Sequence, residues 1–172
     1  MIGRRKFGTS AVYEFTVSKF GSRSSPSATD AKYLKMVHEI ENYHTLSDVE
    51  GVAKSKGVTT EQSIKYGLIT RHYIEYFENG SLLSHMKKEP FKPHQVIDIA
   101  KSTCKTIIEM HKKGVIHKDI KPDNIFIKSI DENGNIVTRI GDLDNSFHRN
   151  DNFKEKALQP KSHQSRMQTP IS

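Results

Sequence analysis

The sequence has a single cysteine, Cys104, and no long hydrophobic run. One cysteine excludes an intramolecular disulfide framework and any metal site built from several cysteines, so nothing in the sequence indicates an oxidising compartment. No apolar run approaches the roughly 20 residues that span a bilayer, and the basic start MIGRRKFGTS is not followed by the apolar stretch of a secretory signal. We therefore expect a cytoplasmic or nuclear protein that makes no membrane contact.

Hydrophobic residues are also scarce, at 34% of the 172 residues. This content predicts one domain with a modest core and some irregular parts rather than full disorder. The formal net charge of +7 would suit a polyanionic partner, yet the lysines and arginines are scattered instead of gathered in one stripe. We therefore do not expect nucleic-acid binding as the main function.

A strand followed by a helix is predicted in the first third of the chain. Apolar and polar residues alternate over 11–20, which is typical of a strand, and a loop-like GSRSSPSATD segment follows. Over 31–46 the apolar residues recur at the spacing of one helical face. They are Tyr33, Met36, Val37, Ile40 and Tyr43. Glu39 lies within that face, so its carboxylate either reaches water at the edge or needs a cation to offset desolvation.

The middle of the chain predicts a strand and one strong helix. We expect 47–63 to be a loop with one short strand, whereas 68–77 is β-branched and aromatic and predicts a strand that ends at an Asn-Gly turn. A helix is predicted from Pro93 to just before Gly114. Its apolar stripe is expected to face the core. The stripe consists of Val96, Ile97, Ala100, Thr103, Cys104, Ile107, Ile108 and His111.

A loop unusually rich in charge lies between short apolar runs in VIHKDIKPDNIFI, residues 115–127. Two short strands, 125–127 and 136–140, follow it and are joined around DENGN, an Asn-Gly hairpin signal. Beyond Ser146 the sequence turns polar and irregular, and we expect a mobile tail there.

The motif HKDIKPDN resembles the catalytic loop of eukaryotic-type protein kinases, H-R-D-x-K-P-x-N, and IGDLDNS resembles the segment that carries their metal-binding D-F-G. The resemblance implies an α+β, protein-kinase-like fold, with ATP and Mg²⁺ as cofactors and a protein hydroxyl as substrate. It implies that Asp119 accepts or orients the hydroxyl proton and that Lys121 reaches the γ-phosphate. Asn124 and Asp142 would be the Mg²⁺ ligands.

Further residues of these two motifs match or depart from the family pattern. His117 corresponds to the family's structural histidine, and Leu143 replaces the usual phenylalanine. Lys118 replaces the motif arginine, which removes bidentate pairing to a phosphorylated activation loop, so we do not expect control by that route. Asp144 replaces the glycine, where its carboxylate would either add a metal ligand or repel the nucleotide phosphates.

The resemblance extends upstream of the catalytic loop. HYIEYFENGSL resembles the strand that leads into the hinge between the two kinase lobes, with Ile74 as the gatekeeper. The hinge residues, whose backbone would meet adenine, are Glu75, Tyr76 and Phe77. HEIENYHTL resembles the regulatory helix, which makes Glu39 the partner of the ATP-anchoring lysine, and TVSKF nominates Lys19 as that lysine.

The resemblance also sets the expected domain organisation. MQTPIS resembles the end of the activation segment, with Thr169 as its threonine, so we expect the large-lobe helices beyond it to be missing. Residues 1–172 would form one partial kinase-like domain. In it 1–77 would be an abridged N-lobe and hinge without an intact glycine-rich loop, 78–146 a partial C-lobe, and 147–172 an activation-segment-like tail.

Two functions are consistent with this reading of the sequence. The first is a serine/threonine-type protein kinase domain, present as a fragment, because a lysine follows Asp119-Ile120 as it does in that class. The second is a kinase-like binding or regulatory module with impaired catalysis. In either case the apolar helix 93–113 would lack its usual neighbours, and we expect an exposed patch that promotes self-association.

Overall fold

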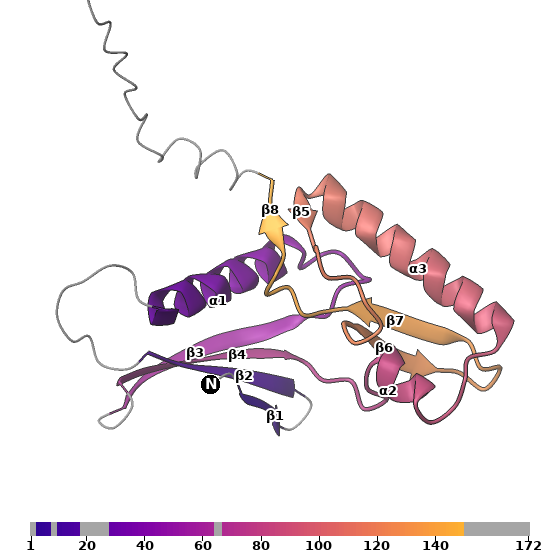
Figure 1. Cartoon of the computed structure of the whole chain (residues 1–172), viewed down its shortest axis with the longest axis horizontal. Coiled ribbons are helices and arrows are strands. Elements are labelled where there is room, and N and C mark those ends of the chain that lie inside the picture. Colours follow the sequence, from indigo (N-terminus) through magenta and orange to yellow (C-terminus); the bar gives the residue numbers. More distant parts are fainter. Residues whose placement is uncertain (1–2, 8–9, 18–27, 64–66, 150–172) are drawn as a thin grey trace, which may run out of the picture.

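The structure is a computed structural model that describes the backbone of residues 3–7, 10–17, 28–63 and 67–149 and the side chains of 34–62 and 69–149. Over these residues the chain folds into antiparallel sheets and helices, which confirms the expected α+β class (Figure 1). The predicted residues Lys19 and Thr169 lie outside the described part. No helix within it has the length and apolar character needed to cross a membrane.

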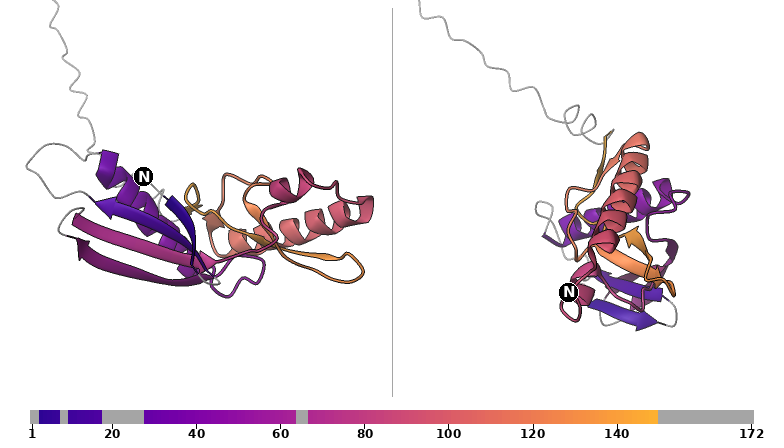
Figure 2. Two further views of the ribbon diagram at one scale, coloured as in Figure 1. Left: turned by 90° about the horizontal axis from the view of Figure 1, so that it is seen from below. Right: turned by 90° about the vertical axis from the view of Figure 1, so that its right-hand side faces the viewer.

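The N-terminal half is built on one four-stranded antiparallel sheet. Its strands are β1 (Gly3–Phe7), β2 (Ser10–Val17), β3 (Ser55–Ser63) and β4 (Gly67–Glu75), in the order β1-β2-β4-β3. Helix α1 (Ala28–Thr45) lies along one side of this sheet (Figures 1 and 2). The predicted strand and helix are therefore present, with Met36, Glu39 and Tyr43 buried as their spacing indicates.

Strand β3 corrects the expectation that 47–63 is mainly a loop. It is an edge strand whose residues 55–62 are exposed, so its sequence shows no alternation of buried and exposed side chains. Backbone pairing with β4, which runs from Ser55↔Ile74 to Ser63↔Gly67, holds this segment extended. An edge strand with both faces in water carries little hydrophobic signal.

The C-terminal half contains two helices and a hairpin. Helices α2 (Leu82–Met86) and α3 (Pro93–Lys112) precede strands β6 (Ile125–Ile130) and β7 (Ile136–Ile140). The hairpin turn is the predicted one, because Asp131 Oδ1 accepts the backbone N–H groups of Asn133 (2.9 Å) and Asn135 (2.8 Å). Gly134 adopts φ 80°, a conformation that favours glycine.

A third, very small sheet was not expected. Strand β5 (Val115–Ile116) pairs antiparallel with β8 (Phe147–His148), and the Arg149 N–H donates to the Gly114 carbonyl at 2.7 Å. The prediction of a mobile tail from residue 147 is therefore wrong for 147–149, whereas 150–172 lie outside the described residues. Strands of two residues are too short to produce a periodic pattern.

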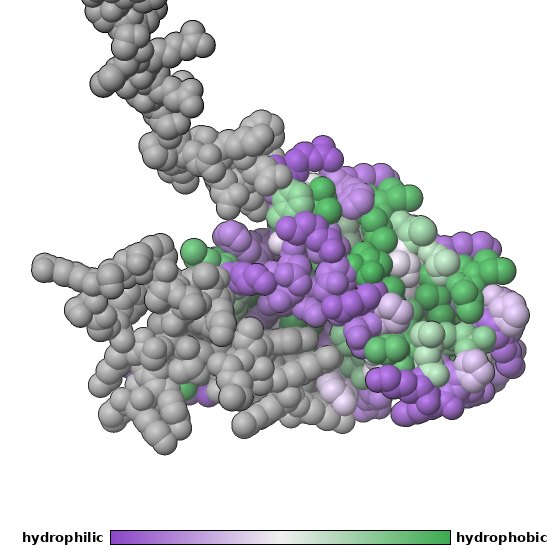
Figure 3. Space-filling view, viewed as in Figure 1, coloured by the Kyte–Doolittle hydropathy of each residue, from purple (hydrophilic) through white to green (hydrophobic). Residues whose placement is uncertain are grey.

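Helix α3 has the predicted bounds but not the predicted orientation. The residues that it buries are Ile99, Thr103, Thr106 and Met110. Most of the predicted core stripe is exposed instead, with Val96, Ile97 and Ile108 at 51, 53 and 55%. At 100° per residue the buried row and the predicted stripe are centred about 100° apart around the helix, so only part of a wide apolar arc is covered. Figure 3 shows hydrophobic surface gathered over this helix.

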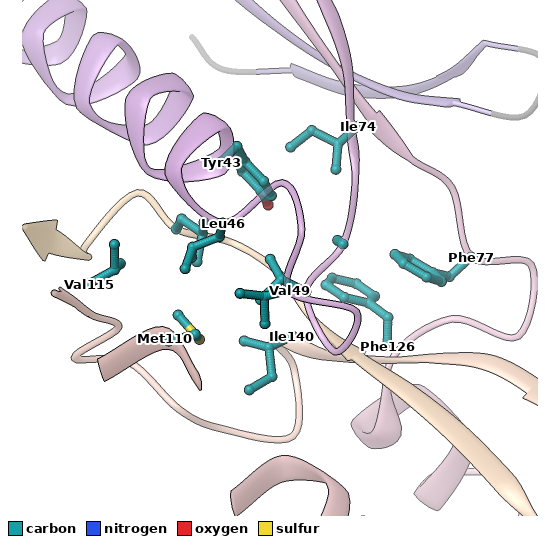
Figure 4. Close-up of a cluster of buried hydrophobic side chains, with 12 residues drawn as sticks. Tyr43, Leu46, Val49, Ile74, Phe77, Met110, Val115, Phe126 and Ile140 are labelled. Carbon is teal, nitrogen blue, oxygen red and sulfur yellow. The ribbon is translucent and has the colours of Figure 1, made fainter. Parts of the chain in front are cut away.

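One hydrophobic cluster joins the two halves of the molecule (Figure 4). It contains α1 residues such as Tyr43 and hairpin residues such as Ile140. The backbone reinforces this junction, because the Ile140 N–H donates to the Gly51 carbonyl and the Ala53 N–H donates to the Ile140 carbonyl, both at 2.8 Å. The segment after β7 is also held against α1, because Tyr43 Oη accepts the Asp142 N–H and Asn42 Nδ2 donates to Ser146 Oγ.

Candidate active site

His117 connects the charged loop, residues 117–124, to the backbone at Gly141. Its side chain is only 3% exposed, its Nε2 lies 3.0 Å from the Gly141 carbonyl oxygen, and its Nδ1 accepts the Asp119 N–H at 3.2 Å. These two bonds together require the tautomer that carries its proton on Nε2. His117 therefore connects the loop to the backbone that follows β7, and so sets the distance between Asp119 and Asp142.

Asp119 lies at the centre of the loop and accepts from two side chains. Lys121 Nζ donates to Asp119 Oδ2 at 2.7 Å, and Asn124 Nδ2 donates to the same oxygen at 3.2 Å and to the Asp119 carbonyl at 2.9 Å. The hydrogen bond from Lys121 lowers the pKa of the Asp119 carboxyl. Asp119 is therefore an ionised acceptor at neutral pH.

Asp142 follows strand β7 and lies next to the loop. The Gly141 N–H donates to the Asn124 carbonyl at 2.9 Å, which brings the two segments together. Asp142 adopts φ 62°, a conformation that few residues other than glycine occupy. Burial raises the pKa of its carboxyl, and the negative charge of Asp144 raises that pKa further. Lys35 Nζ, 3.9 Å from Asp144, partly offsets this concentration of charge.

The donor atoms of this site suit a hard cation. Asn124 Nδ2 is engaged by Asp119, so its Oδ1 remains as a ligand, and the Asp142 carboxylate on the adjoining segment is a second oxygen donor. Nowhere in the described part do three or more His, Cys, Asp or Glu side chains gather in a way that could hold a metal ion. Mg²⁺ does not need such a group, because it is commonly held by one or two protein oxygens together with phosphates and water. Asn124 and Asp142 therefore fit Mg²⁺.

Glu39 points from α1 into the interior and is 8% exposed. Burial, followed by the charges of Asp142 and Asp144, raises the pKa of its carboxyl to about 8. Among the residues that the structure describes, none donates a hydrogen bond to this carboxyl, and its predicted partner Lys19 is not one of them. The alternative of a carboxylate that reaches water at the edge of the helix is wrong, since the side chain is buried.

The predicted hinge begins within the last residues of strand β4 and continues beyond it. Ile74, Glu75 and Phe77 are buried, and Tyr76 is partly exposed. The Glu75 carboxylate forms an ion pair with Lys128 of β6 and accepts the Lys54 N–H at 3.3 Å. Phe77 stacks on Phe126 with their ring centroids 5.2 Å apart. The hinge is thus fixed by side chains of β6, contacts that no local sequence pattern indicates.

Lys118 illustrates another contact that sequence reasoning missed. It has φ 64°, and its Nζ lies 4.8 Å from the centroid of the Phe147 ring. This cation–π contact attaches the loop to strand β8. The position that carries an arginine in the family motif therefore contacts an aromatic ring of the following segment.

Comparison with known proteins agrees with this geometry. The family model described as "Protein kinase domain" matches residues 13–162. The chain therefore belongs to the protein kinase family.

The similar curated proteins are all much longer than the matched part. The chain is 27% identical over 141 residues to the calcium-dependent protein kinase SK5 of Glycine max, a match that covers 78% of this chain and 27% of that protein. It is 30% identical over 98 residues to the serine/threonine-protein kinase PknB of Mycobacterium leprae, a match that covers 56% of this chain and 15% of that protein. It is 38% identical over 81 residues to the human receptor-interacting serine/threonine-protein kinase 1, a match that covers 44% of this chain and 11% of that protein. The chain thus spans less than a third of each relative.

Proposed function

We propose that this chain transfers the γ-phosphoryl group of MgATP to a serine or threonine hydroxyl of a protein. The observation that carries the proposal is the arrangement of Asp119, Lys121 and Asn124 on one loop, tied by the Gly141 N–H to the segment that presents Asp142. The names of the similar proteins support serine/threonine specificity. The cytoplasmic or nuclear location expected from composition stays a prediction.

The roles of the residues follow from their placement. The substrate oxygen would bond to the γ-phosphorus while the bond between that phosphorus and the ADP oxygen breaks, and the ionised Asp119 would take the hydroxyl proton. Lys121, already beside Asp119, would place its positive charge near the transferred group. Asn124 and Asp142 would hold Mg²⁺, which neutralises charge on the phosphate oxygens when bound.

Nucleotide binding is the first prediction to test. A ligand that binds only the folded state raises its stability, and at 100 times its Kd the gain is about 2.7 kcal/mol, or roughly 5 to 10 °C in Tm for a chain of this length. Thermal melting of the purified chain with ATP and Mg²⁺ should show such a shift. Asp142→Asn should remove most of the part that depends on Mg²⁺.

Glu132→Gln provides the matched control for that experiment, because Glu132 is exposed in the hairpin turn, outside the charged loop. It should leave the nucleotide shift unchanged. If millimolar ATP with Mg²⁺ does not move the melting midpoint of the unaltered chain, the kinase proposal for this chain is wrong.

A second candidate function is a kinase-like module that binds nucleotide weakly or not at all. One observation favours it: Asp144 adds negative charge beside Asp142. Extra carboxylate charge would repel the phosphates that the site must hold. The melting experiment separates the two functions, because this module would show little or no shift.

Self-association is a further expectation and involves the exposed apolar row of α3. Val96, Ile97 and Ile108 leave contiguous apolar surface uncovered, and such surface commonly binds a second copy. Sedimentation velocity over a concentration series should detect oligomers. Ile97→Glu should reduce them, whereas Val58→Glu, at an exposed position on β3, should not. A monomer that binds no hydrophobic dye at any concentration would contradict this expectation.

A further inference from the structure

Helix α1 is attached to the candidate metal-binding segment by polar contacts of three side chains, two of which are buried. Tyr43 Oη accepts the Asp142 N–H at 3.1 Å, and Asn42 Nδ2 donates to Ser146 Oγ at 3.1 Å. Tyr43 and Asn42 are 2% and 3% exposed. The third contact, from Lys35 Nζ to Asn145 Oδ1 at 3.2 Å, is exposed to solvent. Buried hydrogen bonds hold geometry better than exposed ones, because water does not compete for them.

The Tyr43 hydroxyl is itself held in a fixed place. The ring belongs to the central hydrophobic cluster (Figure 4) and meets the His72 ring edge-on, with centroids 5.2 Å apart and an interplanar angle of 69°. His72 is in turn connected by its Nε2 to Ser55 Oγ at 3.0 Å. The Tyr43 ring is closely packed in this cluster, so it cannot rotate away without opening the core. The hydroxyl oxygen is therefore a rigid acceptor.

The backbone at Asp142 needs such an acceptor. Its φ of 62° is disfavoured for a residue with a Cβ, so the surrounding structure must maintain it. The partly buried N–H group also needs a partner. Tyr43 supplies that partner. On the other side of Leu143, a fully buried residue, the Ser146 N–H donates to the Leu143 carbonyl at 3.1 Å, and Asn42 fixes the Ser146 side chain.

We propose that Tyr43 is a positioning residue whose hydroxyl holds Asp142 in its left-handed conformation, and that Asn42 assists by holding Ser146. The consequence for the metal rests on the proposed function: the Asp142 backbone keeps the conformation that presents its carboxylate to a metal only while Tyr43 holds it. Glu39, one turn before Tyr43, makes no hydrogen bond to this segment among the described residues. The connection between α1 and the site therefore runs through Tyr43 and Asn42.

Amide hydrogen exchange tests the hydrogen bond without any ligand. In the full chain, Tyr43→Phe removes only the hydroxyl, so the Asp142 amide should exchange on the order of tenfold faster, as expected for losing one such bond. The Ile140 amide, which donates to the Gly51 carbonyl, is the internal reference and should be unchanged. Asn42→Leu, which keeps the side-chain volume, should instead accelerate the Ser146 amide.

Tyr73→Phe is the matched control. Tyr73 lies on β4 next to His72, and its hydroxyl accepts from Thr59 at 3.4 Å, away from Asp142. This variant should leave the exchange of Asp142 unchanged. If the Asp142 amide exchanges equally fast in Tyr43→Phe and the unaltered chain, or if Tyr73→Phe accelerates it as much, the proposal is overturned.

Binding of Mn²⁺ tests the consequence for the site. Mn²⁺ titrated in the presence of ATP should broaden the Asp142 amide signal, and Tyr43→Phe should weaken this effect about tenfold, the loss typical of removing a residue that orients a metal ligand. ATP affinity without metal should not change. Unchanged Mn²⁺ affinity in Tyr43→Phe would refute the positioning role. If the unaltered chain binds neither ATP nor Mn²⁺, the proposed function fails, and the exchange of Asp142 still decides whether Tyr43 holds its backbone.

Discussion

Asp119→Asn is expected to lower kcat for phosphotransfer by about 100-fold to 10,000-fold, the usual contribution of a positioned general base. The substitution keeps the size of the side chain but removes the negative charge that accepts from Lys121. Nucleotide does not contact this carboxylate in the proposed arrangement, so the thermal shift produced by ATP and Mg²⁺ should persist. Transfer of labelled phosphate to a serine-containing protein substrate provides the measurement.

The same loop offers a matched control in Asp123, which is exposed. Asp123→Asn changes the net charge of the loop by the same amount and should retain nearly full activity. A kinase activity that survives in Asp119→Asn at more than a tenth of the original rate would exclude Asp119 as the proton acceptor. Equal losses in both variants would indicate that loop charge, rather than proton transfer, is responsible.

Glu39→Gln is expected to abolish a loss of stability that the unaltered chain undergoes above pH 6.5. The Glu39 pKa rises from 4.5 to about 8 on folding, mainly through burial, so its stabilising contribution is complete below pH 4.5 and is lost as the pH rises through 8. The His72 pKa falls from 6.5 to about 4 through burial, so its contribution is present above pH 6.5 and is lost as the pH falls through 4. Each group changes the free energy of unfolding by about 1.4 kcal/mol per pH unit within its window.

The two contributions oppose each other where the windows overlap, between pH 4.5 and 6.5. Between pH 6.5 and 8 only Glu39, of these two groups, changes its contribution. The free energy of unfolding should therefore fall by roughly 2 kcal/mol over that interval. Urea unfolding at pH 6.5 and pH 8 measures this directly. Glu41→Gln, at an exposed position on the same helix, should behave like the unaltered chain. If Glu39→Gln does not alter the pH profile, Glu39 is ionised at neutral pH, as a charge pair with Lys19 would require.

The parts that sequence predicted well depend on local signals. The loop around Asp119 is recognisable because its functional residues lie within a few positions of one another. Helix α3 begins at Pro93 and is followed by Gly114 with φ 80°, as the helix-boundary residues indicated. The hairpin was predicted from its Asn-Gly turn. In each case the physical cause lies within a few residues of its effect.

The parts that sequence did not predict depend on contacts between distant segments. Strand β3 is extended because β4 pairs with it, and its exposed side chains carry no pattern. Lys128 pairs with Glu75 across 53 positions, and Tyr43 meets Asp142 across 99. For α3 the periodicity revealed a wide apolar arc but not which part of it the hairpin would cover. Spacing along a chain does not identify a partner on another element.

The side chains of α1 are not equally buried along the helix, so the helix could rotate about its C-terminal end. Its C-terminal end is fixed in the core by Tyr43 and by Leu46, which is 1% exposed, whereas Leu34 is 54% exposed. From Leu46 back to Ala28 the axis extends about 27 Å, so a rotation of roughly 10° near Leu46 would move the far end by about 5 Å and Tyr43 by less than about 1 Å. Small swings would then break the exposed Lys35 contact and spare the bond to Asp142. Only a large rotation of α1 would break the hydrogen bond between Tyr43 and Asp142. The site would therefore respond to large movements of the helix and not to small ones.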